Sequence, residues 1–164
     1  MSAPKNSSGP LPIDSPERRR LPVLLRRAWY GLNQAFRRRI AHLEITPDQF
    51  TVLRTLLEAG PITQRGLTGL MSSDPNTVAS LLERMERAGL VERRPDEKDR
   101  RAHRLSLRPL GKRKYHDARA VAVALQTEIL SVLPEKDREK FLEQLTLVAD
   151  VCRSEAESSP KLKR

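Results

Sequence analysis

The residues of this chain that are best suited to chemistry are arginine and lysine side chains gathered in one short stretch. The segment RRPDEKDRR, residues 93–101, holds eight charged side chains in nine positions, and Pro95 is the exception. A guanidinium group can bind a phosphate or the edge of a base through two parallel hydrogen bonds. Segments of alternating apolar and polar residues stand on both sides, which predicts two β-strands joined by a charged turn. Such a turn is suited to a polyanionic partner.

The charge of the whole chain supports the same class of partner. Lys and Arg number 31 against 21 Asp and Glu, so the net charge is +10, and residues 91–119 alone hold eleven basic and five acidic side chains. Nucleic acid and an anionic membrane are the two candidates. No apolar run approaches the ~20 residues of a spanning helix, and the first twenty residues lack the apolar segment of a secretory signal. We therefore expect a cytoplasmic protein with no membrane partner.

The polar residues that catalysis or metal binding would need are scattered. Cys152 is the one cysteine, which rules out an internal disulfide and every multi-cysteine zinc module. His42, His103 and His116 lie far apart, without the spacing of metal ligands. The chain has no nucleophile elbow, phosphate-binding loop or HExxH motif. We expect no enzymatic activity, no metal and no cofactor. We expect Cys152 to be buried and inert, and the alternative is a thiol that senses oxidation.

The N-terminal half predicts a disordered arm followed by two helices. Residues 1–20 are rich in proline, serine and arginine and poor in large apolar residues. From Leu25 to Leu43 the apolar residues recur in steps of three and four, which indicates one face of a helix. A second helix should begin at Thr46 and Pro47 and end at Gly60. Its predicted core face is Phe50, Leu53, Leu56 and Leu57.

The middle of the chain predicts two short helices and a hairpin. After an extended piece at residues 62–63, Thr63 can cap a third helix, and Asp74 with Pro75 can open a fourth. Gly89 should end the fourth helix just before the first hairpin strand. The predicted buried face of the fourth helix is Val78, Leu81, Leu82 and Met85.

Beyond Pro109 the spacing predicts two further helices and a disordered tail over 153–164. The expected apolar faces are Ala118, Ala122, Leu125, Ile129 and Val132 on the first, and Phe141, Leu145, Val148 and Cys152 on the second. The fold class is therefore mainly α with a small β-hairpin wing. Two short helices followed by a hairpin form a winged helix-turn-helix, in which a helix fits the major groove of DNA and a basic ribbon reaches the minor groove.

Several motifs resemble the MarR family of bacterial transcription regulators. They are ITPDQFTVLRTL, GPITQRGL and DPNTVASLLERMERAGLVERRPDEKDRRAHRLSL, together with Gly111. The resemblance runs from about Leu25 to Cys152, and the wing sequence Asp99-Arg100-Arg101 is its most specific part. It implies a single domain over 21–152, with a DNA-binding lobe over 45–110 and dimerisation helices over 21–44 and 111–152.

The same resemblance implies the partners of the chain. Each subunit of a homodimer would present one winged helix to double-stranded DNA. A small aromatic effector would lie between the dimer helices and the winged domain, where Arg26, Trp29 and His42 are the candidates to line its site. An alternative for Trp29 is a place in the core, because most tryptophans in an apolar stripe are buried.

Helical geometry and residue chemistry then select the DNA-binding residues. Asn76, Thr77, Ser80 and Arg84 should point away from the buried face of the fourth helix and contact bases or phosphates. Arg101, with Arg100 beside it, is the candidate for the minor groove, and Arg94 and Lys98 are candidates for phosphate contacts.

The function expected from these residues is DNA-binding regulation of transcription. The main hypothesis is a homodimeric repressor that binds a pseudo-palindromic operator and is released by a small-molecule effector. The alternative is a sequence-tolerant architectural DNA-binding protein, which the arginines at 18–20 and the basic residues after 160 would also suit. The two differ in their preference for one site, because a repressor should favour its operator by at least ~10³ over random DNA.

Overall fold

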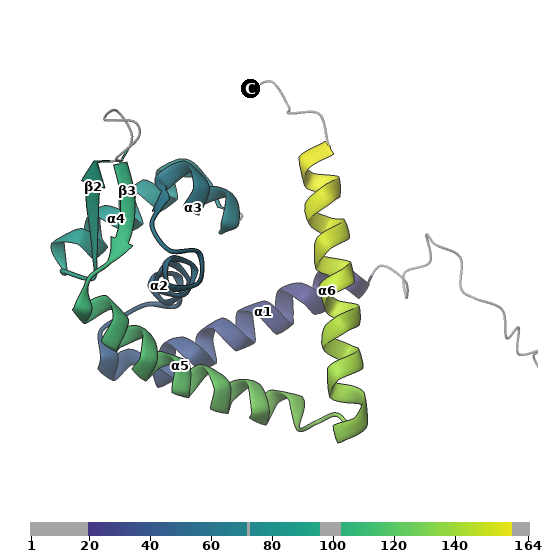
Figure 1. Ribbon diagram of the computed structural model, residues 1–164. Helices are drawn as coiled ribbons and strands as arrows, with labels where there is room; N and C mark the ends of the chain where they lie inside the picture. The colour runs from purple at the N-terminus through teal and green to yellow at the C-terminus, as the bar shows by residue number, and fades with distance from the viewer. Residues whose placement is uncertain (1–19, 72, 96–102, 159–164) are drawn as a thin grey trace, which may run out of the picture. The chain divides into compact units, whose positions relative to one another are not determined.

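The computed structural model describes residues 20–71, 73–95 and 103–158 (Figure 1). Helices dominate, and the three short strands form one antiparallel sheet, so the prediction of a mainly α chain with a hairpin wing is confirmed. The chain forms two compact units that meet between Val121 and Ala122, within one long helix. The elements are α1 (Arg20–Arg39), a 3₁₀ turn η1 (Ala41–Leu43), α2 (Pro47–Ala59), β1 (Ile62–Thr63), α3 (Gln64–Leu70), α4 (Pro75–Arg87), β2 (Val91–Pro95), β3 (His103–Leu107), α5 (Pro109–Leu130) and α6 (Glu135–Ser158).

The first helix starts and ends earlier than its apolar stripe predicts. The described part of α1 runs from Arg20, ahead of Leu25, where the predicted apolar stripe begins. It ends at Arg39, and the apolar pattern continues through η1 to Leu43. The reversal into α2 follows at Glu44, which adopts a left-handed conformation with φ 54°.

The start of α2 is confirmed residue by residue. The Thr46 hydroxyl accepts a hydrogen bond from the Gln49 N–H at 3.2 Å, and the Gln49 side chain accepts one from the Thr46 N–H at 2.8 Å. This reciprocal capping box, with Pro47 in the first turn, satisfies backbone donors that a helix start leaves unpaired. The helix ends at Gly60, whose φ of 71° suits glycine.

The buried face of α2 differs from the prediction at one position. Val52, Leu53 and Leu56 are buried, whereas Leu57 is 37% exposed, so its assignment to the core was wrong. The orientation of the helix is set by the elements that it packs against, α1, α3, α4 and β3, which sequence spacing alone does not reveal. Phe50 is half-buried in an aromatic stack, its ring centroid 5.0 Å from that of Phe36 and 5.5 Å from that of Tyr115.

The helix-turn-helix is held by two side-chain caps and one apolar face. Thr63 accepts a hydrogen bond from the Gly66 N–H at 3.1 Å at the start of α3. Asp74 accepts hydrogen bonds at 3.0 Å from the N–H groups of Asn76 and Thr77 at the start of α4. Both caps are confirmed. So is the buried face of α4, which consists of Val78, Leu81, Leu82 and Met85.

The wing is a ribbon with a buried base. The strand order is β1-β3-β2, with Ile62 opposite Leu105, Val91 opposite Leu107 and Arg94 opposite Arg104. Val91 and Leu105 are each 1% exposed, so they anchor the ribbon to the core. The charged turn predicted between the strands lies over 96–102, outside the described residues.

Two expectations for the C-terminal helices were wrong at their ends. α5 stops at Leu130, so Val132 lies in the following turn and is 82% exposed instead of lining the helix. α6 continues to Ser158, beyond the predicted start of a tail at residue 153, because no proline or glycine interrupts it before Pro160.

The prediction that Cys152 is buried was also wrong. α6 buries none of its residues, and Cys152 is exposed, because nothing within the second unit covers the apolar side of this helix there. Along the described residues, none of the helices combines the length and apolarity needed to cross a bilayer. The same residues hold no group of three or more His, Cys, Asp or Glu side chains that could bind a metal ion.

Candidate nucleic-acid interface

The exposed side of α4 carries polar side chains that can reach a groove of DNA. Asn76, Thr77, Ser80 and Arg84 are all exposed, and their positions fall within about 100° of the helix circumference. The opposite side is tied to the core, so this face is presented on a rigid element. The structure therefore brings together the four residues that were predicted on the fourth helix.

Two arginines on α4 are held against the backbone of the preceding turn. Arg84 donates a hydrogen bond through Nε to the Ser80 carbonyl oxygen at 3.3 Å. Arg87 donates one in the same way to the Glu83 carbonyl oxygen at 3.4 Å. Arg87 was missed by the sequence analysis, although its exposure follows from the same helical periodicity. These contacts restrain the stems of both side chains and lower the entropy lost on binding a partner.

Acid is expected to weaken the start of α4 through Asp74. Hydrogen bonds from the Thr77 side chain and from the backbone N–H groups of Thr77 and Asn76 hold the pKa of Asp74 below its ordinary 3.8. Because the pKa is lower in the folded chain than in the unfolded chain, the carboxylate stabilises the fold above the unfolded pKa, and this contribution is lost as pH falls through the folded pKa.

The measurement is the urea midpoint of the wild type and of Asp74→Asn at about pH 6 and about pH 2. The variant keeps a side-chain acceptor but does not titrate at this position. Its midpoint should therefore fall less than that of the wild type between the two pH values. Equal falls would show that Asp74 contributes nothing to the acid sensitivity.

Both arginines of β2, Arg93 and Arg94, contact carboxylates. Arg94 contacts Glu92 at 2.7 Å while its side chain stays 72% exposed, and Glu92 also accepts a hydrogen bond from the Ser106 hydroxyl at 3.3 Å. Arg93 contacts Glu86 of α4 at 3.2 Å. The other predicted wing residues, Lys98, Arg100 and Arg101, lie outside the described residues, so the structure does not place them relative to α4.

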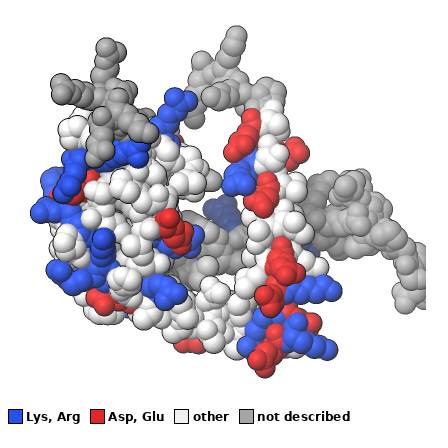
Figure 2. Space-filling model, in the orientation of Figure 1, with Lys and Arg blue, Asp and Glu red and all other residues white. Residues whose placement is uncertain are grey.

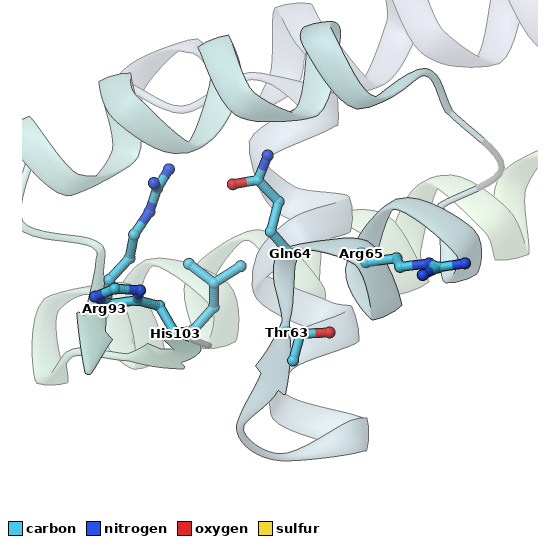
Figure 3. A pocket seen from close by; sticks show the side chains of 6 residues that line it. Thr63, Gln64, Arg65, Arg93 and His103 are labelled. Carbon is cyan, nitrogen blue, oxygen red and sulfur yellow. The ribbon is translucent and has the colours of Figure 1, made fainter. Parts of the chain in front are cut away.

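A hollow of about 360 Å³ lies between the start of α3 and the wing strands (Figure 3). Figure 3 shows Gln64 and Arg93 extending from opposite sides of the hollow in the same direction, while the Arg65 side chain points away from it. Gln64 and Arg65 were missed by the sequence analysis, although the cap at Thr63 places them in the first turn of α3. The lining residues are Thr63, Gln64, Arg65, Arg93, His103 and Leu105.

The residues proposed for an effector lie elsewhere. Arg26 and Trp29 are exposed on α1, His42 is exposed in η1, and none of the three lines the hollow beside the wing. Trp29 is 64% exposed, so its alternative assignment to the core was wrong.

Basic side chains mark the part of the surface that carries these elements. Figure 2 shows Lys and Arg along the outer edge of the first unit, where Figure 1 places α4, β2 and β3. Along α6, in contrast, acidic and basic side chains alternate (Figure 2). Positive charge is therefore exposed beside the helix-turn-helix on this face.

Comparison with known proteins agrees with this architecture. Residues 45–103 match the model of the MarR family. The uncharacterized HTH-type transcriptional regulator YsmB of Bacillus subtilis (strain 168) is 44% identical over 69 residues, which cover 42% of this chain and 47%, about half, of YsmB. The transcriptional regulator HosA of Escherichia coli is 28% identical over 126 residues, which cover 74% of this chain and 93% of HosA.

The similarity extends to three-dimensional structure. A mutant of MarR from E. coli, solved in complex with operator DNA, superimposes with a TM-score of 0.73 and 25% identity, covering 78% of this chain and 92% of that one. The matched family, the similar proteins and the solved structure are all regulators of transcription rather than enzymes. The chain is therefore a member of the MarR family of winged helix-turn-helix transcriptional regulators.

Proposed function

We propose that the chain is a homodimeric repressor that binds a pseudo-palindromic DNA operator and releases it when a small effector binds. The observation that carries this proposal is the exposed polar face of α4, which is fixed to the core on its other side and flanked by a basic ribbon. A helix in the major groove with a ribbon beside it is a geometry that reads duplex DNA. In this proposal the lobe over 45–110 binds DNA.

The contacts follow from the chemistry of each side chain. Asn76 and Arg84 have the paired donors and acceptors that recognise adenine and guanine edges, and Thr77 and Ser80 suit bases or phosphates. Exposed cations beside the helix, Arg94 on the wing and Arg65 on α3, suit phosphates. Lys98, Arg100 and Arg101 remain predicted contacts of the wing tip, with Arg101 in the minor groove.

A second copy of the chain would cover the apolar sides of α1 and α6. Both helices expose more large apolar residues than a monomer usually does, and their charges are complementary. α1 carries six arginines and no acid, whereas α6 carries seven acids against four bases. The exposed apolar residues are Leu21, Val23, Leu24, Trp29, Tyr30 and Leu32 of α1, and Phe141, Leu142, Leu145, Leu147 and Val151 of α6.

One pair of side chains on α1 supports the proposed binding of a small effector. Trp29 is exposed one turn from Arg26. An indole face and a guanidinium at this spacing suit an aromatic ring that carries a carboxylate. A ligand held between this helix and the winged lobe would favour one arrangement of the winged lobes of the two subunits over another. If that arrangement does not fit DNA, the affinity for DNA falls.

Selection of bound sequences from a random duplex pool at ~0.15 M salt tests the proposal, because phosphate attraction alone is weakened at this ionic strength. We expect a pseudo-palindrome whose half-sites lie about 10 bp apart, as a two-fold dimer requires. The selected duplex should bind at least ~10³ times more tightly than random DNA. Strong binding to every duplex without enrichment would instead support the architectural alternative.

A further inference from the structure

An ion pair joins the last turn of α4 directly to the first half of the wing. Arg93 Nε of β2 lies 3.2 Å from Glu86 Oε2 of α4, and the two side chains are 34% and 29% exposed. Between them the chain reverses at Gly89, where φ is 69° and the N–H donates a hydrogen bond to the Glu86 carbonyl oxygen at 2.9 Å. The pair therefore spans the corner between α4, the recognition helix of the proposed DNA site, and the ribbon, and it is partly shielded from water.

Beyond this corner the ribbon is buried at its base and exposed further along. The base of the ribbon is buried through Leu90, Val91 and Leu105, but from Arg93 to the end of β2 the strand is exposed. Each residue extends a strand by about 3.3 Å, so a rotation of about 20° near Arg93 moves Pro95, at the end of β2, by about 2 Å. The ion pair at Arg93 therefore restrains β2 against α4 at the point where the strand becomes exposed.

Arg93 also connects the pair to the opposite strand. It lies opposite Leu105 in the sheet register, and it lines the hollow beside the wing together with Leu105 and His103 (Figure 3). The Arg93 guanidinium contacts Glu86 of α4, while the backbone of its strand, β2, pairs with β3. Rotation of the ribbon against the helix would separate Arg93 Nε from Glu86 Oε2.

We propose that Glu86 is a positioning residue, which acts through Arg93 to hold the wing at the angle that lets ribbon and recognition helix engage one DNA site together. This inference rests on the proposed DNA-binding function. It assigns no DNA contact to Glu86 itself. The proposal also gives a role to Glu86, an acidic side chain on the helix that would approach the negatively charged DNA.

The direction in which the affinity for DNA changes when the Glu86 carboxylate is removed distinguishes a positioning role from simple electrostatic repulsion. Removing a carboxylate near DNA lowers repulsion, so electrostatics alone predicts tighter binding to every duplex. Loss of the positioning contact instead weakens binding to the specific site and leaves binding to unrelated DNA unchanged or slightly tighter. General unfolding would weaken both.

The experiment measures fluorescence anisotropy with two duplexes, the one selected by the wild-type protein and a scrambled one of the same composition. Glu86→Gln should lose about threefold in affinity per subunit, a loss typical of a partly exposed ion pair, and therefore about tenfold for a two-subunit complex. The matched control is Glu58→Gln, which removes the same charge from an exposed pair with Arg54 inside α2. That variant should bind the selected duplex at least as tightly as the wild type.

Two further variants test whether Glu86 acts through Arg93. Glu86→Asp keeps the charge but shortens the side chain by one methylene, so it too should weaken binding to the selected duplex only. In an Arg93→Gln background, Glu86→Gln should no longer weaken binding, because its partner is already absent. Thermal unfolding of each variant provides the test of folding that is independent of DNA.

The outcomes distinguish the two levels of the proposal. Absence of any duplex preferred by the wild type overturns the proposed function and, with it, the basis for positioning. A preferred duplex that Glu86→Gln and Glu58→Gln bind equally well overturns the role of Glu86 alone. An equal loss from Glu86→Gln with and without Arg93 overturns the claim that Glu86 acts through Arg93.

Discussion

Leu145→Asp is expected to separate the two copies of the chain and, with that, to abolish tight binding to the selected duplex. Leu145 lies near the middle of the apolar side of α6, between Phe141 and Val148, and it is 37% exposed in the single chain. A dimer that covers this side would bury two unpaired carboxylates, each at a cost of several kcal/mol. We therefore expect the dissociation constant of the dimer to rise by roughly 100-fold or more.

Loss of the dimer removes DNA binding because two weak half-site contacts no longer act together. In a dimer the second winged helix binds at a high effective concentration once the first is in place. A monomer keeps one helix and one wing, and it should bind the selected duplex about as weakly as random DNA.

The measurement is sedimentation velocity of the variant at micromolar concentration, followed by anisotropy with the selected duplex. Thr146→Asp is the matched control, since it adds the same charge one residue along, on the polar side of α6, where Thr146 is exposed. The control should remain a dimer and bind DNA. A Leu145→Asp variant that stays dimeric would mean that α6 does not face a partner at this position.

Gly111→Ala is expected to destabilise the fold by about 2–3 kcal/mol, the range found when a well-packed site is overfilled. A Cβ atom at Gly111 would overlap the backbone carbonyl oxygen of Leu90 and lie 3.2 Å from Leu53 Cδ2. The carbonyl cannot retreat freely, because it accepts a hydrogen bond from the Arg108 N–H at 3.0 Å and belongs to a residue only 3% exposed.

This glycine therefore allows the first turn of α5 to pack against the corner between α4 and β2. The thermal midpoint of Gly111→Ala should fall by roughly 5–10 °C for a chain of this size. Gly69→Ala is the control, because a Cβ atom at that position would meet no described atom within 4 Å, and α3 should gain up to ~1 kcal/mol from alanine. Equal midpoints for the two variants would show that α5 can shift away from Leu90 without cost.

Local chemistry explains why the starts of the helices could be predicted. Thr46, Thr63 and Asp74 cap helices through hydrogen bonds to backbone groups two or three residues away, so the donor and acceptor are both specified by a few neighbouring letters. The buried face of α4 was equally predictable. Its strong amphipathic pattern leaves one orientation in which the apolar residues are covered and the polar ones meet water.

Features that depend on partners distant in sequence could not be obtained in this way. The core takes Val52 in place of Leu57 because of how α1, α3, α4 and β3 surround α2. The exposure of Trp29 and Cys152 reflects what covers α1 and α6, and an apolar stripe has the same spacing whether it meets its own chain or a second copy.

The amino-acid sequence alone was therefore sufficient for the fold class, the family, the order of the elements and the four exposed residues of the recognition helix, since each rests on periodicity, capping or a contiguous motif. Tertiary structure was required to show that Glu86 meets Arg93, that Gln64 and Arg65 flank the wing, and that Gly111 touches the Leu90 carbonyl. These contacts join different elements, and their geometry is set by the packing of the whole unit rather than by neighbouring residues.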